Sequence, residues 1–313
     1  MLTDARVETP FPVLVQRPPR RAHSWRRTVG RTVSFLVLAF IGLFFLLPMV
    51  WLLLAPTKTH PHLISEMPFA FGSFAQLGRT WSHLYTFEHG VILTWLKNSA
   101  IYTLSGTFLA VAVGIPAGYG LAVTQFIGRR ALLSMTLVVM LVPSNALVLP
   151  LFLGMNDVHL IGNAFAVILP FAFFPFGVYL AYIYFSTAVP EEVLSAARVD
   201  GCSEWLTFRY IAAPLATPVI GLVTFFSFVA NWNNFFLPFI MIPQNTRIPA
   251  SVGLSALLSV SPAFNPSNGG QYSQIWQPEI ALAIIVTIAP ILLVFLFAQR
   301  TLVRGLLVGS TKE

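Results

Sequence analysis

Carboxylates are the side chains of this sequence best suited to chemistry, and they are few and unevenly placed. The chain has eleven Asp and Glu residues, and four of them fall in one polar stretch at residues 190–214 between long apolar runs. The single cysteine, Cys202, excludes an intrachain disulfide and a cysteine metal cluster. A charged stretch of this kind is suited to contact with another protein.

Two short helices joined at a glycine are predicted inside this stretch. Pro190 has the fixed φ that suits a helix start, and the two glutamates after it would occupy the first turn, where the helix dipole favours negative charge. Gly201 can take the positive φ that ends a helix, and Ser203 with Glu204 would begin a second helix running to Ile211. Small residues on one arm suit this elbow to a groove in another protein.

Long apolar runs must position the elbow, because the chain is 56% hydrophobic and only 9% charged, against about 25% charged for a soluble domain. Runs of a length that can span about 30 Å of hydrocarbon lie at residues 32–55, 98–122, 131–153, 163–186, 211–230 and 279–297. The sequence therefore predicts an all-α integral membrane protein with six transmembrane helices. The first run is an uncleaved anchor, since it has 24 uncharged residues against about 7 to 15 in a signal peptide.

The basic residues predict the orientation. Fourteen Lys and Arg residues flank the spans on the side that holds both termini and the elbow, and four lie on the other side. This positive-inside bias predicts cytoplasmic termini and a cytoplasmic coupling segment at about residues 190–210. It also explains the net charge of +7 without nucleic acid.

The predicted domain plan has a tail, a membrane domain and two external loops. Residues 1–31 are basic and proline-rich and are predicted to be a disordered cytoplasmic tail, with residues 32–313 as the transmembrane domain. The external loops are expected at about residues 56–97 and 231–278. Histidines of the first loop lack the spacing of a metal site, so no metal is predicted.

Several chemistries are absent from the spans. No Asp, Glu, Lys, Arg or His lies in the middle of a predicted span, which disfavours an ion-coupled carrier and an intramembrane hydrolase. None of the three lysines follows a glycine, so the chain has no Walker A phosphate loop. Any ATP must therefore be hydrolysed on another polypeptide.

Neutral polar residues at the end of the fifth span could line a translocation path. They are Asn231, Trp232, Asn233 and Asn234, and such residues suit a sugar better than an ion, because sugars are read by hydrogen bonds and ring stacking. The spans also contain Gly114, Pro116, Gly118, Gly120, Pro143, Pro170 and Pro175. These residues either line a cavity at a break in the helix or serve as packing contacts and kinks, and both interpretations remain open.

The spacing of residues in the elbow resembles the EAA signature of permease subunits in binding-protein-dependent ABC importers. Ala196-Ala197, Gly201 and Ile211 keep its intervals, but Ser195 stands at the usual glutamate and Ala213 at the usual leucine. Segments at residues 95–99, 232–235 and 299–312 resemble the carbohydrate branch of these permeases, the MalG-like subunits. The resemblance covers about residues 32–313.

The resemblance implies a type I importer fold in a bacterial or archaeal inner membrane. The chain would be a non-enzymatic permease subunit without a cofactor of its own, paired with a second homologous permease, two ATPase subunits that bind ATP and Mg, and an external solute-binding protein, with a sugar as substrate. Residues assigned to ATPase coupling are Glu192, Ser195, Ala196, Ala197, Asp200, Gly201 and Glu204. The carboxylate missing at Ser195 could be replaced by Glu191, Glu192 or Asp200.

Other functions remain open on the sequence alone. The same kind of importer could carry glycerol phosphate, a peptide or a polyamine, although an anionic cargo would call for cationic groups along the path. A membrane enzyme would need clustered carboxylates or histidines at a span end, and Asp157 with His159 is the only close pair. A channel that acts alone would leave the elbow without a partner, so replacement of Gly201 would be neutral.

Overall fold

The structure is a computed structural model that describes residues 22–268 and 274–308, and this part of the chain is helical with no β-strand. It divides into two compact units, Met1–Trp51 and Leu52–Glu313. Residues 1–21 of the predicted N-terminal tail lie outside the described residues, as do residues 309–313 at the end of the family-like C-terminal segment.

The first unit consists of most of α1, Ala22–Leu54. This helix begins ten residues before the span predicted at residue 32, so the last part of the predicted tail is helical. Its apolar side chains, including Phe35 and Phe40, are exposed all round the helix. Val29–Thr57 is long and apolar enough to cross a membrane, which agrees with a lipid-facing anchor.

The described residues contain up to six membrane spans, as predicted. Four stretches are long and apolar enough to cross a membrane: Val29–Thr57, Phe74–Val123 (α3 and α4 together), Phe165–Thr187 (α7 and α8 together) and Gln277–Gln299. Two more count if each bent helix pair is one span: Arg129–Leu141 with Ser144–Asp157, bent by 103°, and Glu204–Leu215 with Thr217–Trp232, bent by 79°. The apolar run predicted at residues 131–153 corresponds to the first of these bent pairs, and its bend falls at Pro143, which the sequence analysis left as a cavity or kink residue.

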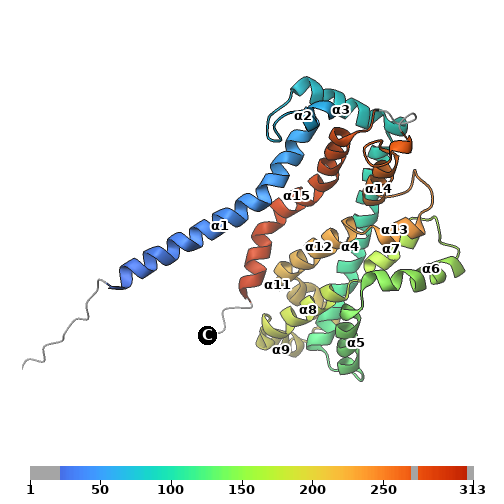
Figure 1. The fold of residues 1–313 in the computed structure, drawn as a ribbon. Helices are drawn as coiled ribbons and strands as arrows, with labels where there is room; N and C mark the ends of the chain where they lie inside the picture. Colours follow the sequence, from blue (N-terminus) through green and yellow to red (C-terminus); the bar gives the residue numbers. More distant parts are fainter. Residues whose placement is uncertain (1–21, 269–273, 309–313) are drawn as a thin grey trace, which may run out of the picture. The chain divides into compact units, whose positions relative to one another are not determined.

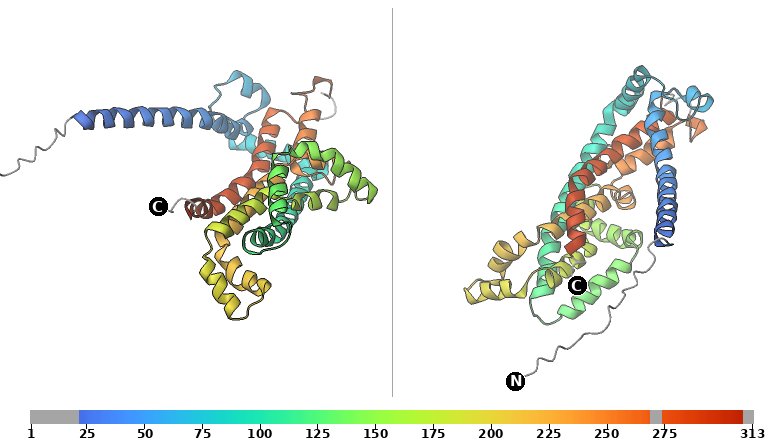
Figure 2. Two further views of the ribbon diagram at one scale, coloured as in Figure 1. Left: turned by 90° about the horizontal axis from the view of Figure 1, so that it is seen from below. Right: turned by 90° about the vertical axis from the view of Figure 1, so that its left-hand side faces the viewer.

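A long helix, α4 (Val91–Val123), organises the second unit (Figures 1 and 2). Three further helices pack against it, and α15 (Gln277–Val308) in turn packs against the last of these. The three are α7 (Phe165–Ala172), α8 (Pro175–Thr187) and α12 (Thr217–Trp232). Close approach is possible where α4 carries Gly118 against Ala181 of α8, which is completely buried.

The remaining helices of the second unit have at most 13 residues and lie around this bundle. They are α2 (His60–Ser65), α3 (Phe74–Thr86), α5 (Arg129–Leu141), α6 (Val148–Asp157), α9 (Glu191–Val199), α10 (Glu204–Thr207), α11 (Ala213–Leu215), α13 (Phe236–Met241) and α14 (Ala250–Val260). A π-helix, Phe208–Ala212, joins α10 to α11, and short 3₁₀ turns cover Ala55–Thr57, Phe87–Gly90, Ser144–Leu147 and Pro266–Asn268.

The segment predicted as an external loop at residues 231–278 contains two short helices, α13 and α14. Their buried residues, among them Met241 and Leu257, join the core cluster that includes Trp95 of α4. The apolar runs here are short, which is why span length did not reveal them.

The segment between α13 and α14, here called the strap, is hydrogen-bonded to α4 through the family-like Trp-Leu-Lys-Asn-Ser sequence at residues 95–99. Trp95 Nε1 donates to Asn245 O at 2.8 Å, and Asn98 Nδ2 donates to Thr246 O at 3.0 Å. Further bonds join Asn98 Nδ2 to Ile248 O, Ala250 N to Ser99 Oγ, and Tyr102 OH to Arg247 O. The motif therefore fixes a loop to the first turns of α4, although the loop lies about 150 residues later in the sequence.

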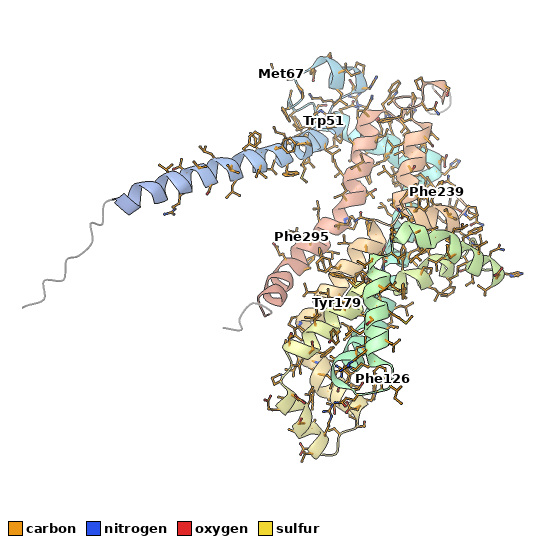
Figure 3. All side chains as sticks on the ribbon, turned by 60° about the horizontal axis from the view of Figure 1, so that its bottom comes forward. Trp51, Met67, Phe126, Tyr179, Phe239 and Phe295 are labelled. Carbon is orange, nitrogen blue, oxygen red and sulfur yellow. The ribbon has the colours of Figure 1, made fainter. Side chains whose placement is uncertain are left out.

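The two ends of the second unit agree with the orientation predicted from charge. Figure 1 shows α9 and the α4–α5 connection at its lower end and α3 at the opposite end. In Figure 3, Phe126 of the α4–α5 connection and Met67, which precedes α3, lie at opposite ends of the second unit. The predicted cytoplasmic segments thus share one end of the unit.

Replacing Gly118 with Ala should destabilise the protein. The added Cβ would overlap the Cβ of Ala181 and lie 2.8 Å from the backbone N of Tyr182, so two helices would have to separate. Overpacking of this kind costs about 1–3 kcal/mol, and we expect a lower melting temperature in detergent.

The matched control is Gly114→Ala, one turn earlier on α4. Its Cβ would meet Val178 at 3.7 Å, which is ordinary contact, and alanine favours the helix. Equal melting temperatures for the two variants would contradict the close contact at Gly118.

Candidate functional site

The elbow forms as its local sequence predicts. α9 begins directly after Pro190, Gly201 has φ +82°, and Ser203 Oγ caps the next helix by accepting from Leu206 N at 3.4 Å. Beyond Thr207 the helix continues as a π-turn and then as α11, so it extends past the predicted end at residue 211.

A network of three polar side chains fastens the elbow to the membrane helices. Arg198 Nε at the end of α9 donates to Glu204 Oε1 at 2.9 Å, and Tyr119 OH of α4 donates to Glu204 Oε2 at 3.1 Å. The hydrogen bond with Glu204 raises the pKa of Arg198. The Tyr119 ring is buried between Phe185 and Phe208, at centroid distances of 5.4 and 5.1 Å. The network therefore links both arms of the elbow to α4.

The outward side of α9 forms a continuous exposed surface, here called the elbow face. Glu192, Ser195, Ala196 and Val199 follow the i, i+3, i+4, i+7 spacing of one helical face, and all are exposed. Val199 is 88% exposed, although it is a large apolar residue in a segment outside the spans. Sequence reasoning missed Val199, which its position one turn after Ala196 could have revealed.

The other residues assigned to coupling divide into two groups. Asp200 and Gly201 are exposed at the tip, and a Cβ on Gly201 would meet nothing within 4 Å. Ala197 is buried within the subunit, at 4% exposure, and the Glu204 carboxylate is held by Arg198 and Tyr119. Ala197 and Glu204 therefore support the elbow face and do not belong to it.

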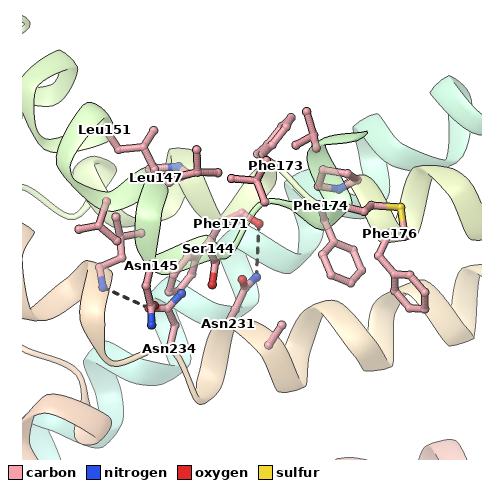
Figure 4. Close-up of a pocket in the computed structure, with 18 residues that line it drawn as sticks. Ser144, Asn145, Leu147, Leu151, Phe171, Phe173, Phe174, Phe176, Asn231 and Asn234 are labelled. Carbon is pink, nitrogen blue, oxygen red and sulfur yellow. Dashed lines mark hydrogen bonds between the residues drawn. The ribbon is translucent and has the colours of Figure 1, made fainter. Parts of the chain in front are cut away.

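A cavity of about 500 Å³ lies where three helix breaks meet (Figure 4). Its walls come from the α5–α6 bend, the α7–α8 break and the end of α12. The lining residues are Val139, Met140, Val142, Ser144, Asn145, Leu147, Val148, Leu151, Pro170, Phe171, Phe173, Phe174, Pro175, Phe176, Ala230, Asn231, Asn234 and Leu237. Pro170 and Pro175, which the sequence left as cavity or kink residues, line this cavity.

Two of the four residues predicted for the path line the cavity. Asn231 is buried, and its Nδ2 lies 3.3 Å from Ser227 Oγ, 3.4 Å from Thr107 Oγ1 and 3.5 Å from Phe171 O (Figure 4). Asn234 Oδ1 accepts from Leu237 N at 3.2 Å.

Trp232 and Asn233 do not line this cavity. The Trp232 indole is buried and donates to Thr287 O of α15 at 3.0 Å, which is a packing role. Asn233 is exposed and donates to Val229 O of its own helix at 3.0 Å.

The cavity offers hydrogen bonds and aromatic faces without charge. No Lys, Arg, His, Asp or Glu is among its lining residues. Ser144 and Asn145 add polar groups, and four phenylalanines add ring surface. Sequence reasoning missed Asn145 and these rings, and the available signal was the helix-breaking Pro143 beside them. Within the described residues, no group of three or more His, Cys, Asp or Glu could hold a metal ion.

Comparison with known proteins assigns the chain to a family. Residues 110–308 match the family of binding-protein-dependent transport system inner membrane components. The chain belongs to this family. It is therefore an inner-membrane, multi-pass permease of the sugar ABC transporter type, and its relatives are transport permeases, not enzymes.

Curated relatives of the permease are named for oligosaccharide transport. The arabinooligosaccharides transport system permease protein AraQ of Bacillus subtilis (strain 168) is 31% identical over 291 residues, covering 93% of this chain and 99% of the relative. The lactose transport system permease protein LacG of Rhizobium radiobacter is 29% identical, covering 92% and 98%. The maltodextrin transport system permease protein MdxG of Bacillus subtilis is 25% identical, covering 92% and 99%.

The fold of the permease has a solved counterpart. A crystal structure of a bacterial ABC transporter involved in the import of the acidic polysaccharide alginate contains a chain that superposes with a TM-score of 0.76. The match covers 90% of this chain and 99% of that chain at 21% identity. It supports the all-α, type I importer fold.

Tyr119→Phe tests the network behind the elbow. The variant keeps the ring but removes the hydroxyl that donates to Glu204, and a hydrogen bond to a charged group contributes about 1.5–3 kcal/mol. We expect amide hydrogen exchange in α9 and α10 to accelerate by roughly tenfold, because the elbow loses its tie to α4.

Tyr210→Phe is the matched control, since it removes a hydroxyl from a tyrosine that is 67% exposed. Exchange in α9 and α10 should stay at the wild-type rate in this variant. Equal exchange in wild type and Tyr119→Phe would show that the hydroxyl does not fasten the elbow.

Proposed function

We propose that the permease forms half of the translocation path for a neutral oligosaccharide and couples to separate ATPase subunits through the elbow face. A second homologous permease would complete the path, and an external solute-binding protein would deliver the sugar. ATP and Mg would bind to two ATPase subunits, since the sequence has no phosphate loop of its own. The membrane lipid surrounds the spans.

One observation carries the coupling proposal: the elbow face is exposed outward and braced from behind. Val199 is 88% exposed and lies outside the spans, so in the isolated subunit its side chain faces water. Burial of a valine side chain in a protein interface would contribute about 1.5 kcal/mol or more to binding. Leu194 and Ala197 on the opposite side are buried in the subunit. A small surface that exposes Ala196 and Val199 and is backed by buried residues fits the groove of a partner protein.

Ser195 carries no charge, but the elbow face and its tip still carry carboxylates. Ser195 stands where the family usually has glutamate, but Glu192 lies one turn earlier on the same face and Asp200 lies at its tip. Both carboxylates are exposed and can pair with basic groups of the ATPase. Glu204 is not available in the same way, because Arg198 and Tyr119 engage its two oxygens.

The network behind the elbow provides a route for movement. When the two ATPase subunits close on ATP, the elbow would move with them as a rigid body. Tyr119 ties Glu204 to α4, and its ring packs on Phe185 of α8, so both helices would follow. Rotation of these helices would take the path from inward-open to outward-open.

The lining of the cavity supports a neutral sugar as the cargo. Asn145, Asn231 and Asn234 present amides, and Phe173 with Phe174 presents ring surface. Sugars are bound by hydrogen bonds and by stacking on aromatic rings. An acidic sugar, a glycerol phosphate or another anion would call for a cationic group, and this subunit places none in the cavity wall.

Val199→Lys tests the coupling role. Lysine suits the last turn of a helix, and the side chain at this position makes no packing contact that the subunit needs, so the fold should be retained. Burying an unpaired ammonium in the ATPase groove is costly, and we expect co-purification of the ATPase subunit to fall by roughly tenfold or more.

Ile127→Lys is the matched control, because Ile127 is as fully exposed in the α4–α5 connection, at 104%, but lies off the elbow. This variant should retain the ATPase at the wild-type level. If Val199→Lys retained the ATPase subunit at the wild-type level, the elbow face would not be the docking site.

Asn145→Ala tests the sugar path. The change removes both an amide donor and an acceptor from the cavity wall, and loss of one hydrogen bond of about 1 kcal/mol corresponds to roughly a fivefold loss. We expect uptake of labelled arabinooligosaccharides or another transported neutral oligosaccharide to need about fivefold more substrate, with ATPase co-purification unchanged.

Asn233→Ala is the control for this measurement, since Asn233 lies outside the cavity and bonds to its own helix. Its uptake should match wild type. A loss in Asn233→Ala with no change in Asn145→Ala would place the path elsewhere, and this outcome is distinct from a loss of ATPase binding.

A further inference from the structure

An aromatic stripe runs along the exposed side of α3 at the outer end of the permease. Phe74, Trp81 and Tyr85 are spaced seven and four residues apart, which puts them on one line of the helix. Phe74 is 78% exposed, and the Trp81 and Tyr85 rings stack with centroids 6.4 Å apart. We define these three residues as the α3 stripe.

The stripe cannot turn inward, because the opposite side of α3 is fastened to the subunit. Gln76, Thr80 and Leu84 are buried. Thr80 Oγ1 donates to Pro56 O at 3.0 Å in a buried position. The stripe therefore points away from the core, with Phe74 78%, Tyr85 51% and Trp81 42% exposed.

A third side of the same helix is polar. Arg79, Ser82 and Thr86 are exposed and lie on the side of α3 away from both the buried residues and the stripe. A helix with separate packing, aromatic and polar sides has the pattern of a segment that lies in a membrane–water boundary.

The position of α3 is at the level where a span begins. His83 Nδ1 lies 3.1 Å from Glu279 Oε1, and Glu279 stands in the first turn of α15, whose candidate span begins at Gln277. At its other end, α3 passes through Phe87–Gly90 into α4, with positive φ at Glu88, His89 and Gly90 turning the chain. Figure 1 shows α3 at the outer ends of α4 and α15.

Further apolar residues are exposed in the segment that precedes α3. Met67 is 79% exposed and projects at this end in Figure 3, and Ile64 and Phe71 are exposed as well. Phe71 packs on Phe74 at a centroid distance of 4.9 Å. A sugar-binding platform would pair aromatic rings with hydrogen-bonding groups, whereas Ile64 and Met67 supply only apolar surface.

We propose that the α3 stripe binds the headgroup and upper acyl region of the outer leaflet, so that α3 is an interfacial helix which sets the depth of the outer end of the permease. Tryptophan and tyrosine favour this zone because one part of each ring is apolar and the other part meets water. His83 of α3 contacts Glu279 at the start of the candidate span Gln277–Gln299, so α3 lies beside the end of a helix that can cross the membrane.

The test uses the full chain in nanodiscs of phosphatidylethanolamine and phosphatidylglycerol that contain a phospholipid with a diazirine near its glycerol. After irradiation, mass spectrometry locates the lipid adducts. Burial of an aromatic side chain in lipid contributes about 1.5–3 kcal/mol to membrane binding. Because Trp81 and Tyr85 would then spend most of their time beside the diazirine, we expect roughly tenfold more adduct on them than on Ser82 and Thr86. Equal labelling of the stripe and the polar side would overturn the proposal.

Phe74→Asp should lower labelling at Trp81 and Tyr85 about fivefold or more, because it places a charge in the stripe. Phe74 is the first residue of α3, where an aspartate suits the helix dipole, so the helix should remain. Ala75→Asp is the matched control at the next position, which is exposed beside the polar side, and it should leave labelling unchanged.

Other occupants would give different results. Absence of lipid adducts, with protection of Trp81 and Tyr85 from hydroxyl-radical oxidation only after an external binding protein is added, would make the stripe a protein-docking surface and overturn the proposal. Protection only by added maltotriose would assign the stripe to sugar and overturn it too. Adducts in wild type remain decisive even if Phe74→Asp fails to fold.

Discussion

The contact of Tyr119 with Glu204 is the interaction on which the arrangement of this permease depends. It joins a buried tyrosine of the central helix to a carboxylate at the start of α10, and that carboxylate also holds Arg198 at the end of α9. A short elbow with one positive-φ glycine would otherwise have few restraints, because its tip meets open space. The hydrogen bonds convert a flexible connection into a surface with a defined direction. They also engage both carboxylate oxygens of Glu204 within the subunit.

The cavity follows a second constraint, which is that backbone polar groups in a membrane must be satisfied or must line a polar space. The helix breaks beside Pro143 and between α7 and α8 free such groups, and Asn145 and Asn231 add side-chain amides at the same place. Polarity is thus concentrated in one region without any charged side chain. A cavity of this composition offers hydrogen bonds and ring surface without charge, and the curated relatives AraQ and LacG are named for the transport of arabinooligosaccharides and lactose.

Sequence reasoning succeeded where the signal was local and failed where it was tertiary. The helix start at Pro190, the elbow at Gly201 and the cap at Ser203 each depend on a few neighbouring residues, and all were predicted. The role of Tyr119 depends on a residue 85 positions away, so no pattern around it could reveal the contact. The short helices α13 and α14 within the segment predicted as an external loop were not foreseen, because they are too short to resemble spans. A break at Pro143 was left open by the sequence, but its angle of 103° depends on tertiary packing.

The strap on the outer part of α4 has a consequence for communication across the membrane. The helix has 33 residues, which at about 1.5 Å per residue makes it roughly 50 Å long. Trp95 and Asn98 hold an external segment near its first turns, and Tyr119 holds the elbow near its last. In the proposed mechanism, a movement started by substrate delivery at one end and a movement started by nucleotide binding at the other would both pass along this single helix, in opposite directions.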